Sequence, residues 1–332
     1  MPNLIDDSQF DPPRIIPSLV EGFNAVASNI YLVLFPILLD LLFWLGPRLR
    51  VKQFFMPLMM EAAELSSAAY GQQATEFVET SRQIWISIFE QFNLLFSLRT
   101  FPIGIPSLLV SYLAEANPIG MPLIIEVTSG NMILLWIISC LLIGLVLGSI
   151  YYALTANAAI GRRPLDTTTV LGQAIQALIL SMMLLVAITL LALPVSCLLS
   201  SLMMVMPSLG TFPFAVLGLM LVWVFLPLVF SPHGIFAGEM KAARSIITSF
   251  RLVRSLMAGT GTFFILLIII GYGMDILWTT PQAESWLLLI GIFGHAFISS
   301  GLLAASFRYY DRGIKWQQSI LQAQKENRPT TA

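Results

Sequence analysis

Residues 167–238 read TTTVLGQAIQALILSMMLLVAITLLALPVSCLLSSLMMVMPSLGTFPFAVLGLMLVWVFLPLVFSPHGIFAG and contain no Asp, Glu, Lys or Arg. As a single helix this stretch would be about 108 Å long, whereas the hydrocarbon core of a bilayer is about 30 Å thick. The stretch therefore predicts two membrane-spanning helices, over residues 171–196 and 212–230. We expect the break between them at the MPSLG turn of residues 206–210.

The composition of the whole chain agrees with this reading. Of its 332 residues, 57% are hydrophobic and only 11% are charged, and the mean hydropathy is +0.83. Soluble domains carry about a quarter of their residues as charged groups, so a water-soluble globule is excluded. The formal net charge of −1 gives no field that would attract nucleic acid, and we expect no nucleic-acid partner.

Four further apolar segments are long enough to cross a bilayer. They cover residues 25–45, 132–154, 255–274 and 285–307, which brings the total to six. The predicted fold class is an all-α, polytopic integral membrane protein: six transmembrane helices in three hairpins, with amphipathic interfacial helices. The alternative is a seventh crossing within residues 84–113.

The distribution of Lys and Arg predicts the orientation. With the N-terminus inside, twelve of the 17 basic residues fall on the inner side, as the positive-inside rule requires. Arg48, Arg50 and Lys52 oppose this orientation, because they directly follow the first span. We expect a multi-pass protein of the cell (inner) membrane, with residues 1–24 and 308–332 cytoplasmic and no cleaved signal peptide.

Residues 46–131 form the largest region outside the predicted spans. Apolar side chains at helical spacing indicate an amphipathic helix over residues 73–98, whose apolar face needs a covering surface. Residues 100–113 are apolar but too short to cross, and Pro102 and Pro106 disfavour a regular helix. This segment either lies at the outer interface or re-enters the membrane, and region 46–131 is the expected docking surface for a membrane-protein partner.

Three inner segments lead into spans. Ser18–Glu21 has the pattern of a capping box, and Asp166 precedes the third span as a helix cap. Residues 235–256 form a basic amphipathic helix, which should lie among anionic lipid headgroups. Its expected headgroup contacts are Lys241, Arg244, Arg251 and Arg254.

Residues 130–312 resemble a bacterial family: the six-span membrane domain attached to some glycerophosphodiester phosphodiesterases, which also occurs as stand-alone proteins. The resemblance rests on the hairpin plan, on the basic helix over residues 239–254 and on the GLLAASFRYYD sequence of residues 301–311. It implies an architecture and no activity, because catalysis in that family belongs to a soluble barrel that this chain lacks. The insert at 46–131 departs from the family pattern.

A few polar residues lie inside the predicted spans. His295 lies near the middle of the last span with Ser299 one turn later, so it is either a functional group or a neutral imidazole bonded to a hydroxyl or an amide on a neighbouring helix. Asp40 and Asp275 are predicted near the outer ends of their helices. There they reach hydrated headgroups or pair with a cation such as Arg48, Arg50 or Arg99; the functional alternative is a paired-acid cation site at the outer mouth.

Known catalytic patterns are missing from the sequence. A rhomboid-type protease needs a serine nucleophile near the start of the fourth span, and residues 212–230 contain no serine. His233 and His295 are too far apart in sequence to make a recognisable zinc motif. We therefore predict no catalytic residue, no metal, no cofactor and no enzymatic activity.

Small residues at four-residue spacing predict close helix–helix packing. They are Gly144 with Gly148, and Gly301 with Ala305. The first functional hypothesis is a non-enzymatic scaffold, assembly or accessory subunit of a membrane complex. The alternative is a permease or lipid-handling protein with a weakly polar path near Gln173, Gln176, Ser181 and His295.

Overall fold

The computed structural model describes residues 11–70, 79, 82–83, 85–90, 92–110, 116–161, 166–206 and 212–326. Most of these residues are helical, and their strands are β1 (Arg48–Arg50) and β2 (Ile124–Glu126), which pair in parallel. The longer helices are α5 (Gly130–Ile160), α6 (Thr167–Val205), α7 (Phe212–Phe225), α10 (Met257–Trp278) and α11 (Leu288–Glu326). The all-α prediction is confirmed for the described part of the chain.

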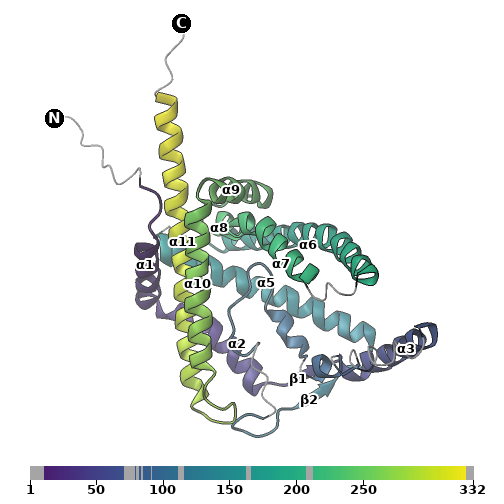
Figure 1. The fold of residues 1–332 in the computed structure, drawn as a ribbon. Coiled ribbons are helices and arrows are strands. Elements are labelled where there is room, and N and C mark those ends of the chain that lie inside the picture. Colours follow the sequence, from purple (N-terminus) through teal and green to yellow (C-terminus); the bar gives the residue numbers. More distant parts are fainter. Residues whose placement is uncertain are drawn as a thin grey trace, which may run out of the picture.

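Within the described residues, five helical segments are long and apolar enough to cross a membrane, and a bent pair of helices would make six. Four of the five are α5, α6, α10 and α11, and the fifth runs from α7 to the end of α8 (Ser231–Phe236) through a short 3-10 turn, η5 (Leu226–Leu228). The chain is thus a multi-pass membrane protein. Figure 1 shows α10 and α11 side by side, with α6 and α7 together on another side of the bundle.

The predicted first span, residues 25–45, is not one straight helix. It contains the end of α1 (Ile15–Ser28), a 3-10 turn η2 (Ile30–Val33) and α2 (Leu34–Leu45), and the two helical arms meet at 92°. Asn29 ends α1, and its side-chain amide donates to the carbonyl of Ala25 at 2.9 Å. An amide that bonds the preceding turn favours the end of a helix over its continuation.

The capping-box prediction at Ser18–Glu21 is wrong, because α1 already begins at Ile15. Inside the helix, the Ser18 hydroxyl donates to the carbonyl of Arg14 at 2.8 Å. The Glu21 carboxylate instead forms ion pairs with Arg308 and Arg312 on α11. Asp166 does lie at the N-cap position of α6, but its carboxylate accepts from Thr168 rather than from a backbone amide.

Helix α1 packs along α11, and small residues permit the close approach. A Cβ atom on Gly22 would lie 2.5 Å from the Cα atom of Ala305, and one on Gly301 would overlap the ring of Phe23. Gly301 and Ala305 therefore do lie at a close helix–helix contact. The partner is α1, which packs on α11 more extensively than on α5, so the first hairpin is not a simple pair of neighbouring spans.

The region between α2 and α5 contains α3 (Lys52–Tyr70), a helical segment around residues 85–90 and the 3-10 turn η3 (Leu94–Leu98). The helix predicted over residues 73–98 ends earlier than expected, because Asn93 caps η3 and accepts from the amide of Leu95 at 3.2 Å. Much of its first half lies outside the described residues. Lys52 links the region through an ion pair with Glu90 at 2.6 Å.

Candidate functional site

Asp40 on α2 is buried and organises a loop that is remote in sequence. Its carboxylate accepts from the Ser107 hydroxyl at 2.5 Å and from the amides of Leu108 and Leu109 at 3.2 Å each. The prediction that Asp40 pairs with a cation near the outer surface is therefore wrong. A buried carboxylate needs hydrogen-bond donors, and here the loop supplies them.

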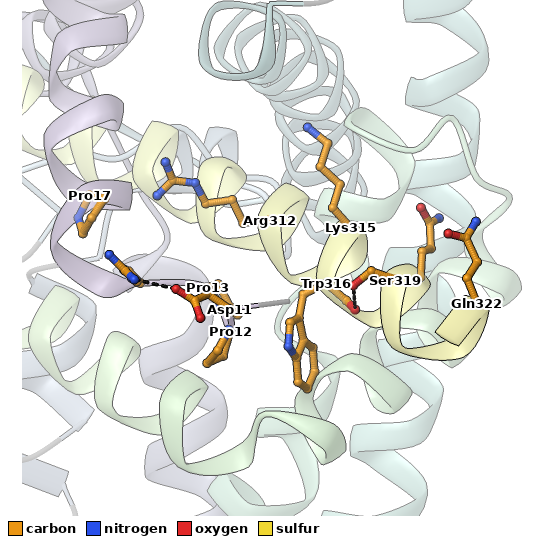
Figure 2. A pocket seen from close by; sticks show the side chains of 11 residues that line it. Asp11, Pro12, Pro13, Pro17, Arg312, Lys315, Trp316, Ser319 and Gln322 are labelled. Atoms are coloured by element: carbon orange, nitrogen blue, oxygen red, sulfur yellow. Dashed lines mark hydrogen bonds and ion pairs between the residues drawn. The ribbon is translucent and has the colours of Figure 1, made fainter. Parts of the chain in front are cut away.

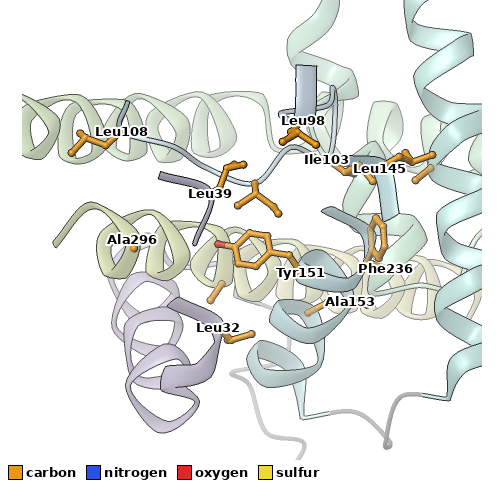
Figure 3. Close-up of a cluster of buried hydrophobic side chains, with 14 of the residues drawn as sticks. Leu32, Leu39, Leu98, Ile103, Leu108, Leu145, Tyr151, Ala153, Phe236 and Ala296 are labelled. Carbon is orange, nitrogen blue, oxygen red and sulfur yellow. The ribbon is translucent and has the colours of Figure 1, made fainter. Parts of the chain in front are cut away.

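The loop that Asp40 holds packs against the middle of α5. A Cβ atom on Gly144 would lie 2.7 Å from the carbonyl carbon of Leu98, and one on Gly148 would overlap the carbonyl oxygen of Ile103. The expectation that these glycines bring two helices together is therefore corrected, since their neighbour is the backbone of residues 98–103. Figure 3 shows Leu98 and Ile103 beside Leu145, in a cluster that also contains Leu39 and Tyr151.

His295 pairs with Asp275. Its Nδ1 atom lies 2.7 Å from Oδ1 of Asp275; the imidazole side chain is 8% exposed and the carboxylate side chain 40%. Because a carboxylate only accepts, Nδ1 carries the proton of this bond. His295 is thus bonded to a neighbouring helix, but its partner is a carboxylate and not the expected hydroxyl or amide. Asp40 lies close enough for an electrostatic interaction with His295.

Ser299 and the other polar residues predicted inside the spans form hydrogen bonds elsewhere. Ser299 donates to the carbonyl of Ala296 on its own helix, and Ser181 donates likewise to that of Ala177. Gln173 donates to the carbonyl of Phe236 at 3.5 Å, and Gln176 accepts from the amide of Ala242 at 2.9 Å.

The two glutamines therefore fasten α8 and α9 (Ala242–Ser255) to α6. Because they bond these neighbours instead of lying with His295, a weakly polar path through Gln173, Gln176, Ser181 and His295 is not formed.

The basic helix predicted over residues 235–256 begins later than expected. Residues 235 and 236 belong to α8, Glu239 has a positive φ of 52°, and α9 starts at Ala242. The side that packs against protein combines small hydroxyl and apolar residues, because its buried residues are Ala242, Ser245, Ser249, Leu252 and Val253. The Ser245 hydroxyl donates to the carbonyl of Ser231, and that of Ser249 donates to Pro227 at 2.7 Å.

The remaining surface of α9 divides into two faces. Ile247 and Phe250 are 51% and 44% exposed, although they are large and apolar. The basic side chains occupy the other exposed face and the C-terminal end, and they are Lys241, Arg244, Arg251 and Arg254. This division into protein, apolar and basic faces suits a helix at the surface of a bilayer.

A second histidine site was not anticipated from the sequence. His233 on α8 is buried, and its Nε2 atom lies 2.7 Å from the Ser306 hydroxyl on α11. Ser306 donates its own proton to the carbonyl of Leu303 at 2.7 Å, so His233 is the donor of the shared bond. The sequence signal was a histidine between proline and glycine, which gave no indication of a partner more than 70 residues away.

The His233–Ser306 pair lies at a large cavity with a volume of about 700 Å³. Apart from this pair its walls are nearly all apolar, and α6, α7, α10 and α11 all contribute to them. Its lining residues include Tyr152, Leu184, Val222, Phe264, Leu267 and Leu303. None of Gln173, Gln176, Ser181 and His295 is among them.

Within the described residues, no group of three or more His, Cys, Asp or Glu side chains is placed to hold a metal ion. The fold and these sites define the chain as a helical, multi-pass membrane protein. No family model, curated protein or solved structure matches it. The resemblance to the membrane domain of glycerophosphodiester phosphodiesterases therefore stays a prediction.

Proposed function

We propose that the chain is a non-enzymatic, lipid-handling protein of the cell (inner) membrane that holds an acyl chain in the cavity beside His233 and Ser306. The cavity is the observation that supports this proposal. It has a volume of about 700 Å³ and almost exclusively apolar walls, which are properties of a site for an apolar ligand.

The position of the cavity supports an acyl chain as the occupant. Its walls come from helices long and apolar enough to cross a membrane, and its rim includes Val222, which is 61% exposed. A hollow on such a surface faces lipid rather than water. Filling it with an acyl chain restores the contacts that its lining would otherwise lose.

The membrane arrangement is part of the same proposal. In this proposal, the bent pair α1–α2 forms the sixth crossing, both termini lie in the cytoplasm, and α9 lies at the inner surface. The exposed cations of α9 would then contact anionic headgroups while Ile247 and Phe250 enter the outer edge of the hydrocarbon.

A photoactivatable fatty acid incorporated into membrane lipids tests the cavity. Val222→Trp should fill its rim and reduce crosslinking to the cavity peptides several-fold. Leu219→Trp is the matched control, because Leu219 is equally exposed at 63% on the same helix but does not line the cavity. Equal crosslinking in both variants and in the parent chain would refute the proposal.

A scaffold or accessory subunit is the second candidate, and one surface favours it. Five apolar residues around β2 are exposed: Ile119, Met121, Leu123, Ile124 and Ile125. Exposed apolar clusters of this kind mark protein or membrane contacts. Purification in mild detergent should then yield a stoichiometric partner that Met121→Lys with Leu123→Lys removes; a lone, monodisperse chain would argue against this role.

A further inference from the structure

A second cavity lies outside the acyl-chain site, where the start of α1 meets the end of α11 (Figure 2). It has a volume of about 630 Å³ and is lined by residues 11–14 and 17 and by one face of α11. The residues contributed by α11 are Arg312, Lys315, Trp316, Gln318, Ser319 and Gln322. Three cations, Arg14, Arg312 and Lys315, therefore surround one hollow.

These cations have carboxylate neighbours but retain donors. Arg14 pairs with Asp11 at 2.5 Å and Lys315 with Asp311 at 2.7 Å, while Arg312 pairs with Glu21. A guanidinium has five N–H donors and an ammonium has three, so one carboxylate does not use them all. The side chains of Arg14 and Lys315 are each 70% exposed, and a phosphate group could reach both.

An apolar groove continues from this basic hollow. It has a volume of about 610 Å³ and shares Pro12, Pro13, Arg14 and Pro17 with the first cavity. Its other lining residues are Ile15, Ile16, Leu256, Gly259 and Tyr309. A polar, cationic chamber that opens into an apolar groove matches a ligand with an anionic head and a hydrocarbon tail.

The depth of the site along α11 also fits a lipid. About 20 residues cross the hydrocarbon core, which places residues 288–307 inside it. Arg312 and Lys315 then lie about 8 and 12 Å farther along the helix axis, at the level of the headgroups. Tyr309 and Gly259 line the groove on the hydrocarbon side of this level. Trp316 is of the residue type that favours the interface.

We infer that this chamber and groove bind an anionic phospholipid of the inner leaflet, with its phosphate among Arg14, Arg312 and Lys315 and an acyl chain along Ile16, Leu256 and Gly259. The site is separate from the His233 cavity, and only the placement of α11 across the membrane is common to both. A lipid bound in this site would contact both the N-terminal segment and the cytoplasmic end of α11.

Native mass spectrometry of the purified full chain with phosphatidylglycerol or phosphatidylcholine tests the inference. The parent chain should bind phosphatidylglycerol preferentially, and Arg14→Gln with Lys315→Gln should weaken that binding about tenfold or more, since it removes two of the three cations that attract the anionic headgroup. Lys52→Gln with Arg82→Gln is the control, because it removes two cations that also belong to exposed ion pairs.

Two further measurements separate a lipid from a free phosphate. Ile16→Asn, at a side chain that is 63% exposed, should weaken lipid binding without unfolding the chain, and inorganic phosphate should not compete with the lipid. Full competition by phosphate together with unchanged binding to the Ile16 variant would assign the hollow to a free anion. Unchanged binding to the Arg14/Lys315 variant would overturn the site itself. Val222→Trp should leave this binding intact, so the two proposals fail independently.

Discussion

Gly144 on α5 leaves no room for a side chain, because its Cβ atom would lie 2.7 Å from the carbonyl carbon of Leu98 and closer still to the carbonyl oxygen. Backbone thus packs directly on backbone in the middle of a helix that is apolar enough to span a membrane. The segment after Leu98 contains Thr100, Ile103 and Ser107, all of them buried. Non-helical backbone at such a depth is stable only when protein covers it, and α2 and α5 provide that cover.

Gly144→Ala should therefore destabilise the chain by about 1–3 kcal/mol, the usual cost of overpacking. Gly172→Ala on α6 is the control, because no atom lies within 4 Å of a Cβ at that position. Alanine favours a helix over glycine, so this control should be neutral or slightly stabilising. Thermal unfolding in detergent measures both variants, and equal midpoints would contradict the packing argument.

Asp40→Ala should loosen the same loop from its other side. The Ser107 hydroxyl and the amides of Leu108 and Leu109 would lose their acceptor, at about 1–3 kcal/mol for each buried group left unsatisfied. Amide hydrogen exchange at Leu108 and Leu109 should accelerate strongly. Asp40→Asn retains one carbonyl oxygen and should have a smaller effect; exchange that stays slow in both variants would show that Asp40 does not hold the loop.

Sequence reasoning located the helical, membrane-embedded class and the main apolar segments, since these follow from composition and length. It also singled out Asp40, Asp275 and His295, which the fold brings to one neighbourhood. It did not find the bend at Asn29 or the loop on Gly144. Both depend on contacts between segments far apart in the chain, and hydropathy along a single segment contains no information on its partners.

Helix α9 shows the same limit of prediction from the sequence. Its basic residues follow from their spacing, but the sequence does not indicate which side of the helix packs against protein; Ile247 and Phe250 are exposed. Besides Ala242, Leu252 and Val253, the buried face contains Ser245 and Ser249, whose hydroxyls donate to the carbonyl groups of Ser231 and Pro227, where the backbone is irregular and needs donors.

Ser249→Ala should consequently weaken the docking of α9. Its hydroxyl donates to Pro227 and accepts from the amide of Phe230 at 3.1 Å, so both backbone groups would lose a buried partner. We expect a loss of about 1–3 kcal/mol. Thr248→Ala, one residue away and partly exposed, should cost clearly less. A protease-protection assay on α9 that cannot distinguish the two variants would refute this assignment.

The Asp275–His295 pair can be measured with a double-mutant cycle. Asp275→Asn, His295→Gln and the double variant should give a coupling free energy of about 0.5–1.5 kcal/mol, the range found for polar pairs between membrane helices. The pair joins α10 to α11, so the readout is the free energy of unfolding in detergent. A coupling indistinguishable from zero would mean that the 2.7 Å contact adds no stability.

The Lys52–Glu90 pair should give the region between α2 and α5 a pH dependence. The hydrogen bond to Lys52 and its charge lower the pKa of the Glu90 carboxyl below its usual value of 4.5. A carboxyl with a lowered pKa stabilises the folded state above its usual pKa, and this contribution is lost as the pH falls through the lowered value. Amide exchange over residues 85–90 should therefore accelerate in acid beyond the intrinsic effect of pH on exchange. Lys52→Met should abolish the excess, whereas Arg82→Met should preserve it, because Arg82 pairs with Glu79, three residues away in its own segment. An excess that survives in the Lys52 variant would assign the pH dependence to another group.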